Sequence, residues 1–257
     1  MKNIKFSIVT VCFNSEKTIE RTFQSILNQN YKNFEYIVID GVSKDKTLSI
    51  VESYKRKFAE LDIDFRVVSE ADDGIYDAMN KGISLSGGEY VGLLNSDDWY
   101  ELEALATINS TINESEFKDI YHGDLIQHES IGSRLIKAKP STIKMDYMGM
   151  CHNHPTFFVK KVVYDKLLYD CKYKILADFK FVCEALIQKF EFYEYGYAIV
   201  NMQAGGASDV NHAKRITEGY RARRDIGFSV TKATVSTVVR VLVTFAVIIK
   251  GKLTGQS

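Results

Sequence analysis

Strand-like and helix-like segments alternate along the first hundred residues, and this alternation constrains the fold more than any other feature of the chain. The strand-like runs, rich in β-branched and aromatic residues, are KFSIVTVCF, FEYIVID, DFRVVS and GEYVGLLN. The runs between them have the apolar spacing of helices: SEKTIERTFQSILNQ, KDKTLSIVESYKRKF and GIYDAMNKGIS. Strands and helices that alternate at roughly 30-residue spacing predict an α/β fold, with a mainly parallel sheet flanked by helices.

Polar and acidic residues stand where each predicted strand ends: Asn14, Asp40, Glu70, Asp73, Asp97 and Asp98. Ligands of parallel sheets bind beyond the carboxyl ends of the strands. The adjacent acids of LLNSDDWY repel each other, so their position asks for an explanation. They could cap the helix-like segment 101–113. Capping does not require acids at every strand end, however, so we favour a binding role.

The phosphate-binding motifs of common nucleotide folds are missing. No GxGxxG follows the first strand and no GxxxxGK[ST] occurs, which disfavours a dinucleotide fold and a P-loop protein. An acidic edge can hold a polyphosphate if a divalent cation bridges the two. Mg²⁺ or Mn²⁺ is typically held by one or two carboxylates plus substrate phosphates, an arrangement that suits Asp97 and Asp98. Such an ion neutralises charge on a diphosphate leaving group.

Two stretches, FSIVTVCFNSEKTIERTFQSILNQNYKNFEYIVIDGVSKDKT and EADDGIYDAMNKGISLSGGEYVGLLNSDDWY, resemble inverting family 2 glycosyltransferases of the GT-A fold. The closest likeness is to bacterial members that build surface polysaccharides, dense over residues 4–100 and sparser to about residue 210. The resemblance implies a nucleotide-diphosphate-sugar donor, with UDP favoured, and a hydroxyl of a saccharide or lipid-linked acceptor. It implies a metal bound through Asp98 with Asp97 beside it, and donor contacts from Thr10, Asn14, Asp40, Asp45, Asn80, Lys81 and Asp97.

The sequence departs from the family pattern in three places. The common stretch Asp-Gly-Gly-Ser-Thr-Asp-Gly-Thr is DGVSKDKT here, Asn95 stands where many relatives carry the first acid of a DxD motif, and the usual Glu-Asp pair is Ala177-Asp178. The last departure keeps open a catalytically silent, sugar-nucleotide-binding subunit of an assembly complex. A sugar nucleotidyltransferase is a second alternative, but VCFNSEKT lacks the Gly-rich, Arg-bearing loop such enzymes need.

Asp178 is the best candidate for a catalytic base. Inversion needs an in-line attack by an acceptor oxygen, and a carboxylate within about 3 Å must take its proton. That carboxylate must be distinct from the metal ligands, and Asp178 begins an amphipathic helix downstream of them. The alternative is that Asp178 only caps this helix.

Three further residues are assigned to the donor or acceptor side of the site. His152 and His154 would share one side of a strand, where a metal pair is conceivable but no matching third ligand lies nearby in sequence. Contacts near the cleft are favoured for both histidines. Trp99 could stack on a sugar or base, although we expect one of Trp99 and Tyr100 to belong to the core.

The chain ends in an apolar segment, TVVRVLVTFAVIIKGK, behind a basic region. From Lys214 onward nine residues are basic and two acidic, so this tail carries +7 and the preceding body −7. The stripe Val235, Val238, Val239, Leu242, Ala246 and Ile249 predicts a helix. The apolar run is short for a span and its flanks are basic, which favours a helix lying on an anionic membrane. The alternative is a helix that closes the core or a dimer face.

These features together predict the domain organisation and location. Residues 1–230 would form one GT-A domain, with a nucleotide-sugar half (1–100) and an acceptor half (101–230), followed by the membrane-associating helix 231–257. The four cysteines form no CxxC pair and are expected to be reduced thiols. No signal peptide is apparent. We therefore expect a cytoplasmic protein at the inner membrane face, with no nucleic-acid partner.

Overall fold

The first four strands form a parallel sheet, as the sequence predicts. In the computed structural model, which describes residues 1–139, 149–150, 152–205 and 212–253, these strands are β1 (Phe6–Cys12), β2 (Phe34–Asp40), β3 (Phe65–Ser69) and β4 (Tyr90–Leu93). The intervening helices are α1 (Ile19–Leu27), α2 (Thr47–Glu60) and α3 (Ile75–Leu85). The order is β3-β2-β1-β4, and Cys12 pairs with Asp40, so the loops after β1 and β2 leave the sheet side by side.

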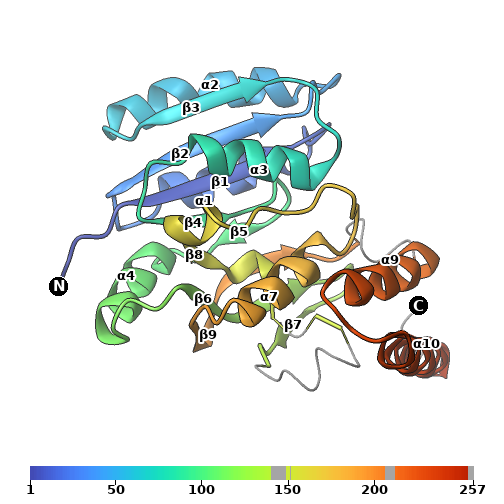
Figure 1. Cartoon of the computed structure of the whole chain (residues 1–257). Helices are drawn as coiled ribbons and strands as arrows, with labels where there is room; N and C mark the ends of the chain where they lie inside the picture. The colour runs from blue at the N-terminus through green and yellow to red at the C-terminus, as the bar shows by residue number, and fades with distance from the viewer. Residues whose placement is uncertain (140–148, 151, 206–211, 254–257) are drawn as a thin grey trace.

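The remaining strands extend the same sheet with mixed directions. They are β5 (Trp99–Tyr100), β6 (Ile120–His128), β7 (Ser133–Ile136), β8 (Phe158–Lys160) and β9 (Phe192–Gln203). Beyond β4 the order is β8-β6-β9-β5, with β7 paired to β6; only the β6–β9 pair is parallel here. Because β4 pairs with β8, one continuous sheet joins the two halves of the chain (Figure 1).

Alternation along the strands builds an apolar core on each face of the sheet. On β1, Phe6 and Ile8 face one core, and Val9 and Val11 face the other. The first core contains α1, α2 and α4 (Ala104–Glu114), and the second contains α3, α6 (Lys161–Tyr164) and α7 (Ala177–Ile187). The result is a three-layer α/β/α arrangement.

Gly82 explains how closely α3 lies on the sheet. A Cβ built on Gly82 would lie 2.2 Å from Cγ1 of Val9 on β1, so any side chain there would push the helix away. Close approach of a helix to a strand is one of the uses of glycine. The short distance keeps the start of α3 beside the loop after β1, where the candidate site lies.

Two helices follow the sheet and pack against each other at its far end. They are α9 (His212–Asp225) and α10 (Val230–Leu253), drawn in red in Figure 1, and α9 also contacts α7. Val235, Val238, Leu242 and Phe245 of α10 are each about half exposed or more. Within the part of the chain that the structure describes, no helix is both long and apolar enough to cross a membrane.

Candidate active site

A cleft of about 920 Å³ lies beyond the carboxyl ends of the parallel strands, at the edge where the sequence predicts a site. Its lining comes from the loop after β1, the segment that leads into α3, the turn after β4, the end of β9 and the start of α7. Asn14, Asp45, Asp97, Asp98, His154 and Asp178 all line it. Residues far apart in sequence thus meet in one cavity.

Asp98 is the most deeply placed carboxylate of the cleft, with 1% of its surface exposed. Its Oδ1 accepts a hydrogen bond from the Gln203 backbone amide (3.1 Å), and its Oδ2 accepts one from the Asn95 side chain (3.2 Å). Burial and the neighbouring charge of Asp97 nevertheless raise the pKa of Asp98 to about 8. The carboxylate therefore has too little positive charge around it to offset its burial.

Asp97 is more open, and Arg21 is the nearest cation to the pair. Burial raises the pKa of Asp97 as well, against the attraction of Arg21. The Arg21 guanidinium donates to the Asp97 carbonyl (2.9 Å) rather than to a carboxylate, and lies 3.5 Å from the centre of the Trp99 ring. Arg21 thus bonds to the backbone beside the two acids and not to their carboxylate oxygens.

The helix-capping interpretation of this acidic pair is wrong. The following helix, α4, begins at Ala104 with Glu103 at the N-cap, and the Asp98 side chain bonds to β9 and to Asn95 instead. Among the described residues, no three His, Cys, Asp or Glu side chains form a metal cluster. Two carboxylates still suit a magnesium or manganese ion that takes its other oxygens from donor phosphates and water.

Asp178 lines the same cleft from the first turn of α7, which begins at Ala177. Its Oδ1 accepts a hydrogen bond from the Phe179 amide (2.8 Å). The Tyr76 hydroxyl shares its one hydrogen between Asp178 Oδ1 (3.2 Å) and the Ile175 carbonyl (2.9 Å). Burial raises the pKa of Asp178, although His154, the Phe179 amide and Tyr76 favour the charged form. A carboxylate with a raised pKa is a better proton acceptor at neutral pH than an exposed one.

The segment before α7 is fixed by a carboxylate that the sequence did not reveal. Glu218 of α9 is 5% exposed and accepts hydrogen bonds from three successive backbone amides, those of residues 174–176, at 2.9–3.1 Å. Tyr76 was also missed, although it lies in the quoted stretch GIYDAMNKG. Glu218 holds the backbone in front of Asp178, and Tyr76 orients the carboxylate itself.

The loops that follow β1 and β2 hold Asn14 and Asp45 at the cleft. The Asn14 side chain accepts from the Lys44 amide (2.8 Å), and Asp45 accepts from the Glu16 and Thr47 amides (3.1 and 2.9 Å). Val42 in the same loop has φ +62°, a left-handed conformation that is strained for a β-branched residue. The common family stretch has glycine there, and this departure has a backbone cost.

Thr10 and Asp40 lie beneath the cleft and do not line it. Both are fully buried. Thr10 accepts from the Tyr36 hydroxyl (2.9 Å), and Asp40 accepts from Ser69 Oγ (2.6 Å) and from the Ser43 amide and hydroxyl. In this structure Asp40 shapes the loop that carries Asp45, so a direct donor contact would require Ser43 to move.

Asn80 and Lys81 also lie outside the cleft lining. The Asn80 side chain exchanges hydrogen bonds with the backbone of Tyr169, donating at 2.8 Å and accepting at 3.0 Å. Lys81 Nζ bonds to the Ala71 carbonyl (2.6 Å) and pairs with Glu70 (3.0 Å). Both predicted donor contacts are engaged in holding loops in place.

The two histidines do not share a side, because residues 154–156 form the short 3₁₀ helix η1 (His154–Thr156) rather than a strand. His154 lines the cleft and bonds to the Tyr169 hydroxyl (2.8 Å). The His152 ring packs against His122, with 4.4 Å between ring centres, and burial lowers the pKa of His152 to about 4. Trp99 lies between Arg21 and His128 outside the cleft lining, while Tyr100 is buried.

Residues 7–160 match the family described as Glycosyl transferase family 2, well over half of the chain. The chain belongs to glycosyl transferase family 2. A PGL/p-HBAD biosynthesis glycosyltransferase of Mycobacterium bovis is 31% identical over 178 residues, 68% of this chain and 67% of that protein. The amylovoran biosynthesis glycosyltransferase AmsB of Erwinia amylovora is 35% identical over 118 residues, 45% of this chain and 38% of AmsB.

Solved structures establish the fold. Staphylococcus aureus TarS 1-349 in complex with UDP-GlcNAc aligns with TM-score 0.69 at 19% identity, over 93% of this chain and 72% of that one. A longer TarS structure is matched over 90% of this chain but 41% of its own length (TM-score 0.68, 21% identity). A Pyrobaculum calidifontis mannosyltransferase with GDP-Man and Mn²⁺ aligns with TM-score 0.65 at 13% identity, over 96% and 76%. The predicted family, GT-A fold class and glycosyltransferase activity are confirmed.

Proposed function

We propose that this glycosyltransferase moves a sugar, with inversion and with the help of a divalent metal, from a UDP-sugar to a hydroxyl of a lipid-linked saccharide. The product would enter a cell-surface polysaccharide. One observation carries the proposal: the Asp97–Asp98 pair, in the turn after β4, and Asp178, at the start of α7, line the same cleft from separate elements. An inverting reaction needs such a division between the leaving-group side and the base.

The relatives support the class of donor and product. The structural neighbours contain UDP-GlcNAc in one case and GDP-Man with Mn²⁺ in the other. AmsB carries the name of amylovoran biosynthesis. The cleft volume of about 920 Å³ lies in the upper part of the range for small-molecule sites, as a nucleotide sugar requires.

Each carboxylate has a separate part in the proposed reaction. Asp98, with Asp97, would hold Mg²⁺ or Mn²⁺, which when bound supplies positive charge for the departing diphosphate. Asp98 must lose its proton to act as a ligand, and its raised pKa makes this step pH-dependent. Asp178 would take the acceptor proton on Oδ2, since Tyr76 and the Phe179 amide both occupy Oδ1.

Nucleotide release is the measurement that tests this function. The purified chain is mixed with UDP-, GDP- and dTDP-sugars, with and without Mn²⁺, and donor binding is followed in parallel by thermal shift. We expect metal-dependent binding and slow hydrolysis of one donor class. If the chain binds a donor but neither hydrolyses it nor transfers its sugar to a membrane extract, the silent-subunit alternative is favoured.

We further propose that α10 lies on the cytoplasmic face of an anionic membrane. Val235, Val238 and Leu242 of the predicted stripe are exposed on this helix, together with Phe245. The exposed Arg221 and Arg224 of α9, together with Lys232, add attraction for anionic head groups. Apolar side chains beside cationic ones are the pattern of helices that lie in the interface plane.

Vesicle sedimentation tests this second proposal. The double variant Val238→Glu/Leu242→Glu should bind phosphatidylglycerol-containing vesicles about 10-fold less than the parent, because two apolar side chains leave the lipid. Leu61→Glu/Leu102→Glu, which adds the same two charges at exposed leucines outside α10, serves as the control. Equal losses in both variants would show that negative charge alone, and not α10, reduces binding.

A further inference from the structure

One face of the segment that begins with α1 is polar and yet buried. Thr22 of α1 and Gln29, just after the helix, are buried, and Ser25 between them is half-buried. Polar side chains of a surface helix normally face water, and a buried polar group is costly unless it is hydrogen-bonded. The hydrogen-bond partners of these three side chains therefore show what the face is for.

Two side chains near the start of α1 hold the backbone of the acid pair. Thr22 Oγ1 donates a hydrogen bond to the Asp98 carbonyl (2.7 Å), and the Arg21 guanidinium donates to the Asp97 carbonyl (2.9 Å). Both bonds end on main-chain atoms, so they fix two successive peptide groups without engaging a carboxylate oxygen. Because Thr22 is buried, water does not compete for its hydrogen bond as it does at the surface.

The same contact continues along the residues that follow the acid pair. Ser25 Oγ accepts a hydrogen bond from the Tyr100 amide (3.2 Å), and the Gln29 side chain donates to the Glu101 carbonyl (2.8 Å). Among the described strands, β5 pairs with β9 alone, so its other edge has no strand beside it. Side chains from the α1 segment bond to backbone groups that would otherwise lack partners there. The position of α1 and the position of the acid pair are thus coupled.

We propose that this face of α1, with Thr22 at its centre, positions Asp97 and Asp98 for the divalent metal, a role that rests on the function proposed above. A magnesium site requires near-ideal octahedral geometry, so its carboxylates must be held in place. The Asp98 carboxylate has two hydrogen bonds of its own, and Thr22 holds the peptide group that follows its Cα. Without the Thr22 hydroxyl the charge of the pair is unchanged, but its backbone is less firmly held, so metal affinity should fall.

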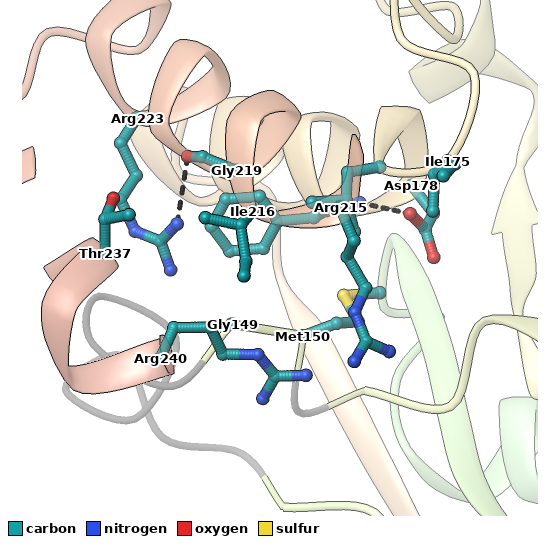
Figure 2. Close-up of a pocket in the computed structure, with 12 residues that line it drawn as sticks. Gly149, Met150, Ile175, Asp178, Arg215, Ile216, Gly219, Arg223, Thr237 and Arg240 are labelled. Atoms are coloured by element: carbon teal, nitrogen blue, oxygen red, sulfur yellow. Dashed lines mark hydrogen bonds between the residues drawn. The ribbon is translucent and has the colours of Figure 1, made fainter. Parts of the chain in front are cut away.

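The proposed base is held by a different part of the molecule. The Asp178 carboxylate accepts a hydrogen bond from the Phe179 amide of its own helix, α7 (Figure 2). Helix α1 packs on one face of the sheet and α7 on the other. A substitution on α1 should therefore weaken the metal-dependent step and leave the base in place.

Calorimetric titration of UDP into the full-length chain, once with Mn²⁺ and once with EDTA, measures the metal contribution without turnover. Thr22→Val keeps the size of the side chain but removes its hydroxyl. We expect this variant to bind UDP like the parent in EDTA but at least about 10-fold more weakly with Mn²⁺, as for other groups that orient metal ligands. Thr22→Ser keeps the hydroxyl and should restore the Mn²⁺ effect. Ser25→Ala, which removes the bond to the Tyr100 amide, should show the same selective loss and serves if Thr22→Val does not fold.

Thr111→Val is the matched control for a general loosening of the fold. Thr111 is a buried threonine of α4, and its hydroxyl donates to the Thr107 carbonyl (2.8 Å). Urea unfolding should show a loss of stability in both valine variants, whereas the Mn²⁺ effect on UDP binding should fall in Thr22→Val alone. A parental Mn²⁺ effect in Thr22→Val, or an equal decrease in both variants, would overturn the positioning role.

Asp98→Asn in the same titration separates this role from the function on which it rests. Loss of the Mn²⁺ effect in Asp98→Asn but not in Thr22→Val would refute the positioning role alone. A parent that binds UDP equally well with Mn²⁺ and with EDTA would refute the metal-dependent function, and the positioning role with it.

Discussion

Each end of the parallel sheet buries a carboxyl group, and the pKa values of the two groups are shifted in opposite directions. Glu35, near the amino end of β2, and Asp98, after the carboxyl end of β4, are both 1% exposed. Burial raises the pKa of Glu35, but Ser7, the Gly87 amide, Arg66 and Lys5 together bring it below its usual value. Asp98 has an amide, an Asn side chain and a neighbouring acid, and its pKa is about 8.

The difference separates a carboxylate that protein cations compensate from one that they do not. Glu35 finds cations on two neighbouring segments, with Arg66 in contact and Lys5 at 3.7 Å. At the other end, the Arg21 guanidinium donates to a backbone carbonyl instead of the acids. A buried carboxyl group without a compensating cation is costly to ionise, and strongly shifted acids in clefts cluster at functional sites. The following changes test this contrast.

Replacing the Asp98 carboxyl group should have the largest effect on turnover. Asp98→Asn should reduce turnover about 10³-fold and abolish the Mn²⁺ dependence of donor binding, because the leaving diphosphate loses its metal. Initial-rate kinetics with and without Mn²⁺ measure both. Asp165→Asn, an exposed acid paired with Lys161, is the control. Unchanged metal dependence in Asp98→Asn would refute the metal assignment.

The Asp98→Asn variant should also change how the free energy of unfolding depends on pH. An acid with a raised pKa gives the folded chain more bound protons than the unfolded one between about pH 4 and pH 8. The free energy of unfolding contributed by Asp98 therefore falls as pH rises through this window. Urea unfolding at several pH values should show this fall in the parent and a flatter profile in Asp98→Asn. A parent profile that rises across the window would contradict it.

Asp178, which lines the cleft from α7, should show the next largest effect. Asp178→Asn should lower turnover about 10²-fold with donor affinity unchanged, since a proton acceptor is lost but no donor contact is. Asp178 is not the N-cap of α7, which is Leu176, and Asn has nearly the same shape as Asp, so stability should stay near normal. Glu184→Gln, on the same helix, is the matched control. Near-normal transfer at saturating donor and acceptor would refute the base role.

At the amino end of the sheet, replacing Glu35 should lower stability without changing catalysis. Glu35→Gln leaves Arg66 without its buried partner and should lower the free energy of unfolding by about 2 kcal/mol. Urea denaturation measures the loss. The kcat/KM value should remain within about twofold of the parent, because no cleft residue moves. A large loss of activity at full stability would show that the two ends are coupled.

The smallest effect is expected at Val42, in the loop that carries Asp45. Val42→Gly removes the strain of φ +62° but adds freedom to the unfolded chain, so the net gain in stability should be below about 1 kcal/mol. Differential scanning calorimetry gives the sign. Leu61→Gly, at an exposed residue with φ −100°, should destabilise instead. A loss of stability in Val42→Gly would show that the valine side chain contributes packing.

Local pattern was enough for the parallel half of the fold and for the place of the acids. Apolar alternation and βαβ spacing put Asp97 and Asp98 at the correct edge, and Asp178 does reach the same cleft. The pattern could not tell which polar residues of a motif face the ligand. Thr10, Asp40 and Asn80 bond to Tyr36, Ser69 and Tyr169, partners set by tertiary packing.

The missed residues act over long separations in the chain. Glu218 contacts residues 174–176 across more than forty positions, and the amide that bonds to Asp98 belongs to Gln203. A backbone amide carries no sequence signal, and a single glutamate on a polar helix looks like any solvated residue. Only the folded arrangement shows that both serve the cleft.

The contact of Glu218 also has a mechanical meaning. Glu218 belongs to α9. This helix holds the backbone just before Asp178 and also packs against α10. The hydrogen bonds of Glu218 thus link the position of α9 and α10 to the position of Asp178. A displacement of α9 would be transmitted to Asp178 over a few ångströms of hydrogen-bonded chain, with no intervening loop to absorb it. A change in the position of the C-terminal helices would therefore alter the position of Asp178.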